Sequence, residues 1–260
     1  MLLLPIIWFN VIKTLYAYQV TNSGDELSSR ILYGERANIS DYPFFAALSN
    51  CGAAIISDRW LVTAAHCVIS NTGPVWVGGD SIKSSQRYTY DKAVIYPHYQ
   101  EIVFSILLND IAILRLSQPL KFSNTVKAIK LPKQDYERNA IHAFAGKGTN
   151  EKKQMSQYLM RMNVRTVKQE ECLSHGTNRL LRRYLEPYLD CISNVTICST
   201  RTENKPGMCF GDSGSPLVRN NILVGIASYI TDRDCKRARL GLFTNVAPFV
   251  DWITSVTGVK

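Results

Sequence analysis

The chain has 260 residues, of which 46% are hydrophobic and 20% are charged, with a formal net charge of +9. We expect a globular protein with a packed core rather than a low-complexity chain. Seven cysteines without a CxxC pair predict disulfides in an oxidising compartment and exclude a zinc site of that pattern. The positive charge would attract polyanions weakly, although a general contribution to solubility is the preferred interpretation.

The N-terminus begins with an apolar run from Leu2 to Phe9, which is shorter than the about 20 residues that a spanning helix needs. This run and the small residue Ala17 predict a signal peptide over residues 1–17, and therefore secretion without a membrane span. Residues 18–30 are short and polar and end at Arg30, directly before Ile31.

Short apolar runs between turn residues predict strands over most of the remaining chain, and residues 247–257 are predicted to form a closing helix. Two sets of strands at this spacing suit a pair of antiparallel barrels, although spacing alone does not specify that architecture. The predicted strands are Phe44–Leu48, Ala53–Ile56, Trp60–Thr63, Val75–Val77, Lys92–Ile95, Ile111–Leu116, Ile141–Phe144, Leu159–Val167, Leu217–Val218, Ile222–Ser228 and Leu240–Asn245.

Three short motifs carry the candidate chemistry. His66 lies in LVTAAHC, Asp110 in NDIAILRL and Ser213 in MCFGDSGSP. A serine hydroxyl is a poor nucleophile until a base takes its proton, and an imidazole with a pKa of about 6.5 suits that role near neutral pH. A buried carboxylate then fixes the imidazole tautomer. Each motif alone has a structural alternative, such as a surface turn or a core histidine, but their joint occurrence favours catalysis.

The chain order His66, Asp110, Ser213 is that of the chymotrypsin arrangement. Together the three motifs resemble those of the trypsin and chymotrypsin family of serine endopeptidases, and the resemblance covers residues 31–260. It implies an all-β fold of two antiparallel six-stranded barrels, with the catalytic cleft between them and a C-terminal helix. It also implies a trypsin-like serine protease domain that acts on protein or peptide substrates without a cofactor or metal.

In that family the serine attacks the scissile carbonyl, which implies that Ser213 forms an acyl-enzyme with His66 as base and then acid. Asp110 would orient the imidazole. The backbone N–H groups of Gly211 and Ser213 would form the oxyanion hole, where glycines permit the backbone conformation and close approach that the substrate needs.

The resemblance also implies activation by proteolysis. Cleavage after Arg30 by an activating protease would free the α-amino group of Ile31, which would pair with Asp212. Burying either charge alone is costly, so the chain is expected to be a zymogen with residues 18–30 as its propeptide. Tyr33 stands where the family usually has glycine, which is a departure from the pattern.

The pocket for the residue before the scissile bond would be lined by Gly207, Met208, Ser228, Ile230 and Gly241. Gly207 stands where trypsin-like enzymes have aspartate, so a buried arginine or lysine would lack its counter-charge. Met208 and Ile230 are bulky and would narrow the pocket. We therefore expect an elastase-like or chymotrypsin-like preference for apolar residues, small or medium aliphatic ones first and aromatic ones as the alternative.

Further features follow from the resemblance and from secretion. The implied disulfides are Cys51–Cys67, Cys172–Cys198 and Cys209–Cys235, which leaves Cys191 over, with Cys172–Cys191 as an open alternative. Asn38 and Asn194 begin N-glycosylation sequons. We expect a monomer that meets serpin-type or other protein inhibitors and has no specific nucleic-acid partner. The alternative function is a catalytically weak homologue that binds a glycan or a protein.

Overall fold

A computed structural model describes residues 34–102, 106–150, 153–168, 170–172, 186, 189–201, 207–232, 234–235, 238 and 240–260. The predicted signal peptide and propeptide lie outside the described residues, as do Arg30, Ile31 and Tyr33. No helix in the described part of the chain is both long and apolar enough to cross a membrane.

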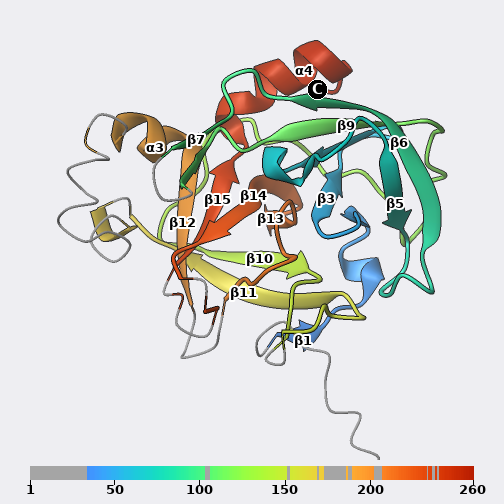
Figure 1. Ribbon diagram of the computed structural model, residues 1–260, viewed down its shortest axis with the longest axis horizontal. Helices are drawn as coiled ribbons and strands as arrows, with labels where there is room; N and C mark the ends of the chain where they lie inside the picture. Colours follow the sequence, from blue (N-terminus) through green and yellow to red (C-terminus); the bar gives the residue numbers. More distant parts are fainter. Residues whose placement is uncertain are drawn as a thin grey trace, which may run out of the picture.

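The first barrel closes through six antiparallel strands in the order β2-β3-β4-β9-β6-β5 (Figure 1). Its inward-facing side chains, among them Ile55, Leu61 and Leu114, are fully buried and form one apolar core. The strands are β2 (Phe45–Ala47), β3 (Gly52–Ile55), β4 (Trp60–Thr63), β5 (Gly73–Val77), β6 (Gln86–Ile95) and β9 (Ala112–Leu116).

The second barrel follows the order β11-β10-β13-β14-β15-β12 and closes where β12 pairs with β11. Strand β1 (Glu35–Arg36) adds to the outer edge of β11. Phe144 and Phe243 meet edge to face in the core of this barrel, with their ring centroids 5.6 Å apart. The six strands are β10 (Ile141–Gly146), β11 (Met160–Thr166), β12 (Thr196–Arg201), β13 (Pro216–Arg219), β14 (Ile222–Ile230) and β15 (Leu240–Asn245).

Short elements connect and cover the barrels. Helix α4 lies at the top of Figure 1, and Ile253 anchors it in a core that both barrels share. Gly258 ends α4 with a φ of 72°, a left-handed conformation that glycine adopts without strain. The remaining elements are η1 (Ile39–Asp41), η2 (Ala65–Cys67), β7 (Gln100–Ile102), β8 (Ile106–Leu108), α3 (Leu189–Val195), η5 (Ala247–Phe249) and α4 (Val250–Thr257).

The predicted fold class is confirmed, because each barrel has six antiparallel strands and a helix closes the chain. The shared core contains Val62 and Ile113 from the first barrel and Val218 and Leu223 from the second. Apolar contact over this surface fixes the two barrels relative to each other. Loops from both barrels can therefore hold side chains of one site in a constant geometry.

Candidate active site

His66 and Asp110 come from neighbouring segments of the first barrel. His66 lies in η2 directly after β4, and Asp110 precedes β9 after a turn in which Asn109 has a φ of 54°. Since β4 and β9 pair in the sheet, the two side chains meet. Asp110 Oδ2 lies 2.7 Å from His66 Nδ1, and Asp110 Oδ1 accepts a 3.0 Å hydrogen bond from the His66 backbone N–H. Two bonds to one carboxylate fix both the ring and its backbone.

The second barrel completes the surroundings of Asp110, whose side chain is 0% exposed. Ser228 Oγ on β14 donates to Asp110 Oδ2 at 2.5 Å, and Thr244 Oγ1 on β15 donates to the Asp110 carbonyl at 2.8 Å. The first bond orients the carboxylate and the second anchors the Asp110 backbone to the second barrel. Burial raises the pKa of Tyr99 to about 12, and the negative charge of Asp110 adds to that shift.

These contacts give Ser228 a second role and add Thr244 to the site. Sequence reasoning assigned Ser228 only to the wall of the substrate pocket, whereas its hydroxyl contacts Asp110. It missed Thr244 altogether. The available signal was a threonine at the end of the apolar run Leu240–Phe243, since a polar group buried in such a strand needs a partner.

Ser213 lies in a tight loop between two glycines with positive φ, Gly211 at 90° and Gly214 at 77°. The Ser213 carbonyl accepts a 2.7 Å hydrogen bond from Gly52 of the first barrel. A Cβ atom on Gly214 would lie 2.2 Å from the Gly52 carbonyl oxygen, so no other residue fits this turn. Within the described part of the chain, the N–H groups of Gly211 and Ser213 make no backbone hydrogen bond.

Asp212 is buried, with 1% of the residue exposed. Its two carboxylate oxygens accept hydrogen bonds from the backbone N–H groups of Gly148 at 2.8 Å and Cys209 at 2.9 Å. Burial nevertheless raises the Asp212 pKa to about 7, against the lowering effect of these two bonds. A Cβ atom at Gly146 or Gly148 would lie 2.3 Å from a carboxylate oxygen, so this cradle requires glycine at both positions.

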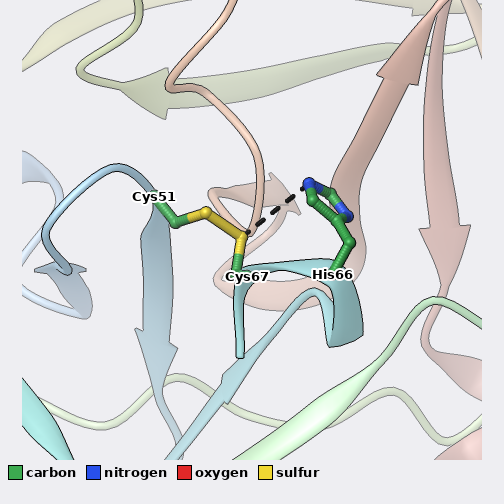
Figure 2. Close-up of side chains that lie close together, drawn as sticks. All are labelled: Cys51, His66 and Cys67. Carbon is green, nitrogen blue, oxygen red and sulfur yellow. Dashed lines mark hydrogen bonds between the residues drawn. A yellow bond between two sulfur atoms is a disulfide. The ribbon is translucent and has the colours of Figure 1, made fainter. Parts of the chain in front are cut away.

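The second ring nitrogen of His66 faces the Cys51–Cys67 disulfide, with Nε2 in a weak contact 3.9 Å from Cys67 Sγ (Figure 2). Among the described residues, no hydrogen bond joins Ser213 Oγ to this nitrogen. Catalytic hydrogen bonds are often long without substrate and tighten when substrate binds. Although Cys51, His66 and Cys67 lie within 4.8 Å of one another, the disulfide leaves neither sulfur as a thiolate ligand.

Four of the five predicted pocket residues line one cavity: Gly207, Met208, Ile230 and Gly241. The fifth, Ser228, is not among the residues that line this cavity, and its hydroxyl contacts Asp110. The cavity measures about 10 Å³, barely the room that one water needs, and the buried Met208 is among its lining residues. A Cβ atom on Gly241 would lie 2.9 Å from Met208 Cε. The remaining lining residues are Val164, Ser199, Thr200, Ala238 and Leu240.

All three implied disulfides are confirmed: Cys51–Cys67, Cys172–Cys198 and Cys209–Cys235. The first crosslinks the segment of His66, and the third ties the nucleophile loop to the loop after β14. The alternative pairing of Cys172 with Cys191 is therefore wrong. The side chain of Cys191 lies outside the described residues.

The predicted sequons lie at the surface. Asn38 is exposed, and its side-chain oxygen caps η1 by accepting from the Ser40 N–H at 3.0 Å. Asn194 is exposed near the end of α3. Both amide groups are therefore on parts of the surface that a glycan can reach, and their occupancy stays a prediction.

A family model described as Trypsin matches residues 31–253. The chain belongs to the trypsin family of serine endopeptidases. It is similar to trypsin beta of Drosophila erecta, with 31% identity over 238 residues that cover 88% of each chain. It is also 28% identical to ovochymase of Halocynthia roretzi over 92% of this chain, which corresponds to 16% of that longer relative.

A solved structure supports the same assignment. The fold is similar to that of neuropsin, a serine protease expressed in the limbic system of mouse brain, with a TM-score of 0.74 and 26% identity. The match covers 87% of this chain and 99% of neuropsin. The trypsin-family fold thus extends over nearly all of the described residues.

Proposed function

We propose that this trypsin-family chain is a secreted endopeptidase in which Ser213, His66 and Asp110 form the catalytic triad. The observation that carries the proposal is the bond between His66 Nδ1 and the buried Asp110 carboxylate. The Cys51–Cys67 disulfide ties the His66 segment to Gly52, whose N–H donates to the Ser213 carbonyl at 2.7 Å. With Nδ1 bonded to a carboxylate, the other ring nitrogen remains free to act as a base. Secretion is supported by the three disulfides, which persist in oxidising compartments.

In the proposed mechanism, His66 Nε2 takes the proton of Ser213 Oγ as that oxygen attacks the scissile carbonyl. The Asp110 carboxylate stabilises the imidazolium that forms, and Ser228 holds the carboxylate in place. The N–H groups of Gly211 and Ser213, which make no backbone hydrogen bond among the described residues, donate to the developing oxyanion. His66 then protonates the leaving amine, and a water hydrolyses the acyl-enzyme by the same steps.

Activation is proposed to follow cleavage after Arg30, with residues 1–17 as signal peptide, 18–30 as propeptide and 31–260 as the protease domain. The support is the buried Asp212 carboxylate, which no cationic side chain contacts among the described residues. A new α-ammonium at Ile31 would supply the missing charge. Because Asp212 lies between both proposed oxyanion donors in sequence, this pairing would hold them in place.

The narrow cavity supports a preference for small or medium apolar residues before the scissile bond. Met208→Ala should enlarge it and raise kcat/KM for Phe or Leu relative to Ala by about 10-fold or more, since each methylene contributes about 1–3 kcal/mol. Substrate competition assays measure this ratio. Met162→Ala is the control, because Met162 does not line the cavity. An unchanged ratio would contradict the assignment of Met208 to the pocket.

A serine-directed phosphonate tests the proposed nucleophile. Protein cleaved after Arg30 is incubated with a phosphonate that carries an apolar side chain, and tryptic peptides are mapped by mass spectrometry. We expect one adduct on Ser213 and much slower labelling of uncleaved protein. Absence of an adduct on correctly cleaved protein would instead favour a binding protein built on a protease fold.

A further inference from the structure

Met155 is the exposed methionine of the described chain. The residue is 43% exposed, whereas Met160 and Met208 are 1% and 4% exposed. The sequence has five methionines, of which Met1 lies outside the described residues and Met162 is half-buried. A diffusible oxidant would therefore reach the Met155 thioether more readily than the other sulfurs of this group.

The Met155 thioether lies directly on the nucleophile loop. A Cβ atom added to Gly211 would be 2.5 Å from Met155 Cε and 2.7 Å from Met155 Sδ. The sulfur therefore occupies the space beside the Gly211 backbone that a side chain would take. Gly211 supplies one of the two proposed oxyanion donors, so this contact links an oxidisable atom to the catalytic loop.

The segment that carries Met155 is fastened to the same loop at two other points. Gly148 N donates to Asp212 Oδ1 at 2.8 Å, and Thr149 N donates to the Phe210 carbonyl at 2.7 Å. Thr149 and Met155 pair with each other as an isolated antiparallel bridge. Phe210 and Asp212, the residues on either side of Gly211, are thus already bonded to the segment of Met155. A chemical change at Met155 would act on Gly211 between them.

We propose that Met155 is a modification site, at which a hydroperoxide forms methionine sulfoxide and lowers the activity of the enzyme. The Sδ lone pair attacks a peroxide oxygen, so an S–O bond forms as the O–O bond breaks. With hydrogen peroxide, the departing hydroxide takes the remaining proton and leaves as water. Sulfur loses two electrons to the peroxide. The proposal rests on the proposed function, in particular on Gly211 as an oxyanion donor.

The sulfoxide would act through the oxyanion site. Its oxygen would be a strong acceptor close to the Gly211 backbone, and a hydrogen bond from the Gly211 N–H to it would withdraw this donor from the substrate. Losing one such donor typically lowers kcat by about 10²–10³-fold. We therefore expect complete oxidation of Met155 to lower kcat by about 100-fold, with a much smaller change in KM, because the Met208 cavity is left intact.

The test uses full-length protein cleaved after Arg30 and treated with hydrogen peroxide. Peptide mass mapping follows sulfoxide formation at each methionine, and kcat and KM are measured in parallel on an apolar peptide substrate. Met155→Leu keeps an apolar side chain beside Gly211 but cannot be oxidised, and Met162→Leu is the matched control. Each variant is compared with its own untreated sample. Methionine sulfoxide reductases then act on the treated parent protein, as a readout that needs no variant.

We expect kcat to fall in proportion to the fraction of Met155 sulfoxide in the parent protein and in Met162→Leu. In Met155→Leu, kcat should stay unchanged after treatment. In the parent protein, kcat should recover after the reductases have acted. A parent protein that is fully oxidised at Met155 and retains kcat within about 3-fold would overturn the proposal. Equal inactivation of Met155→Leu would do so too. In either case hydrolysis by the untreated parent keeps the proposed function standing, whereas an inactive untreated parent would remove both.

Discussion

Asp110→Asn is expected to lower the kcat of the processed enzyme by about 10⁴-fold, the size of effect found when the triad carboxylate of this class becomes an amide. The reason is the geometry around Asp110. Its two carboxylate oxygens accept from the His66 N–H, from His66 Nδ1 and from Ser228 Oγ. An amide offers one acceptor oxygen, and its NH₂ group would oppose a donor and favour the wrong imidazole tautomer.

The measurement is kcat on an apolar peptide substrate across pH 6–9, with active sites titrated where the variant still reacts. Asp91→Asn is the control, since Asp91 forms an exposed ion pair with Arg115 at the surface of the first barrel. The kcat of Asp91→Asn should stay within about 2-fold of the parent value. An Asp110→Asn enzyme within 10-fold of the parent would mean that Asp110 does not orient the catalytic base.

Asp212→Asn is expected to lower the activity gained on processing by about 10²–10⁴-fold. Removing one member of a buried ion pair typically costs about 3–5 kcal/mol, because the other charge stays buried without its partner. Here the partner would be the new α-ammonium of Ile31. The amide would also lose one of the two acceptors that hold Gly148 N and Cys209 N, which weakens the attachment of the Ser213 loop.

This expectation is checked by kcat/KM before and after cleavage, with the cleavage itself confirmed by N-terminal mass analysis. The parent should gain activity on processing, whereas Asp212→Asn should gain little. Asp251→Asn, an exposed change on α4, controls for altered net charge. Full activation of Asp212→Asn would exclude the proposed ion pair, even if Ser213 remains the nucleophile.

Much of the fold could be predicted from the sequence where apolar runs coincide with strands. Trp60–Thr63 and Leu240–Asn245 have the predicted bounds because nearly every residue in them is buried. The first half of β6, from Gln86 to Asp91, was missed because its outward side chains are polar. Strand β12 was missed because its buried Ile197 and Cys198 form too short an apolar run to register as a strand.

The candidate site, like the fold, could be predicted from the sequence only in part. The motifs around His66 and Asp110 predicted a contact that the structure contains, since both segments lie on paired strands. The contacts of Asp110 with Ser228 and Thr244 join residues 118 and 134 positions apart, across two barrels. No local pattern encodes such a pairing. The contact of Met155 with Gly211 likewise depends on how the loop after β10 folds back.

Hydrolysis of a peptide library by three preparations tests the central claim most directly: protein cleaved after Arg30, uncleaved protein, and cleaved Ser213→Ala. We predict that the cleaved parent hydrolyses bonds after Ala, Val or Leu, that the uncleaved protein is nearly inactive, and that Ser213→Ala is inactive. Cleavage after Arg or Lys would contradict the proposed apolar preference of the pocket but would not affect the proposed triad. Equal hydrolysis by the parent and by Ser213→Ala, or none by any preparation, would contradict the triad itself.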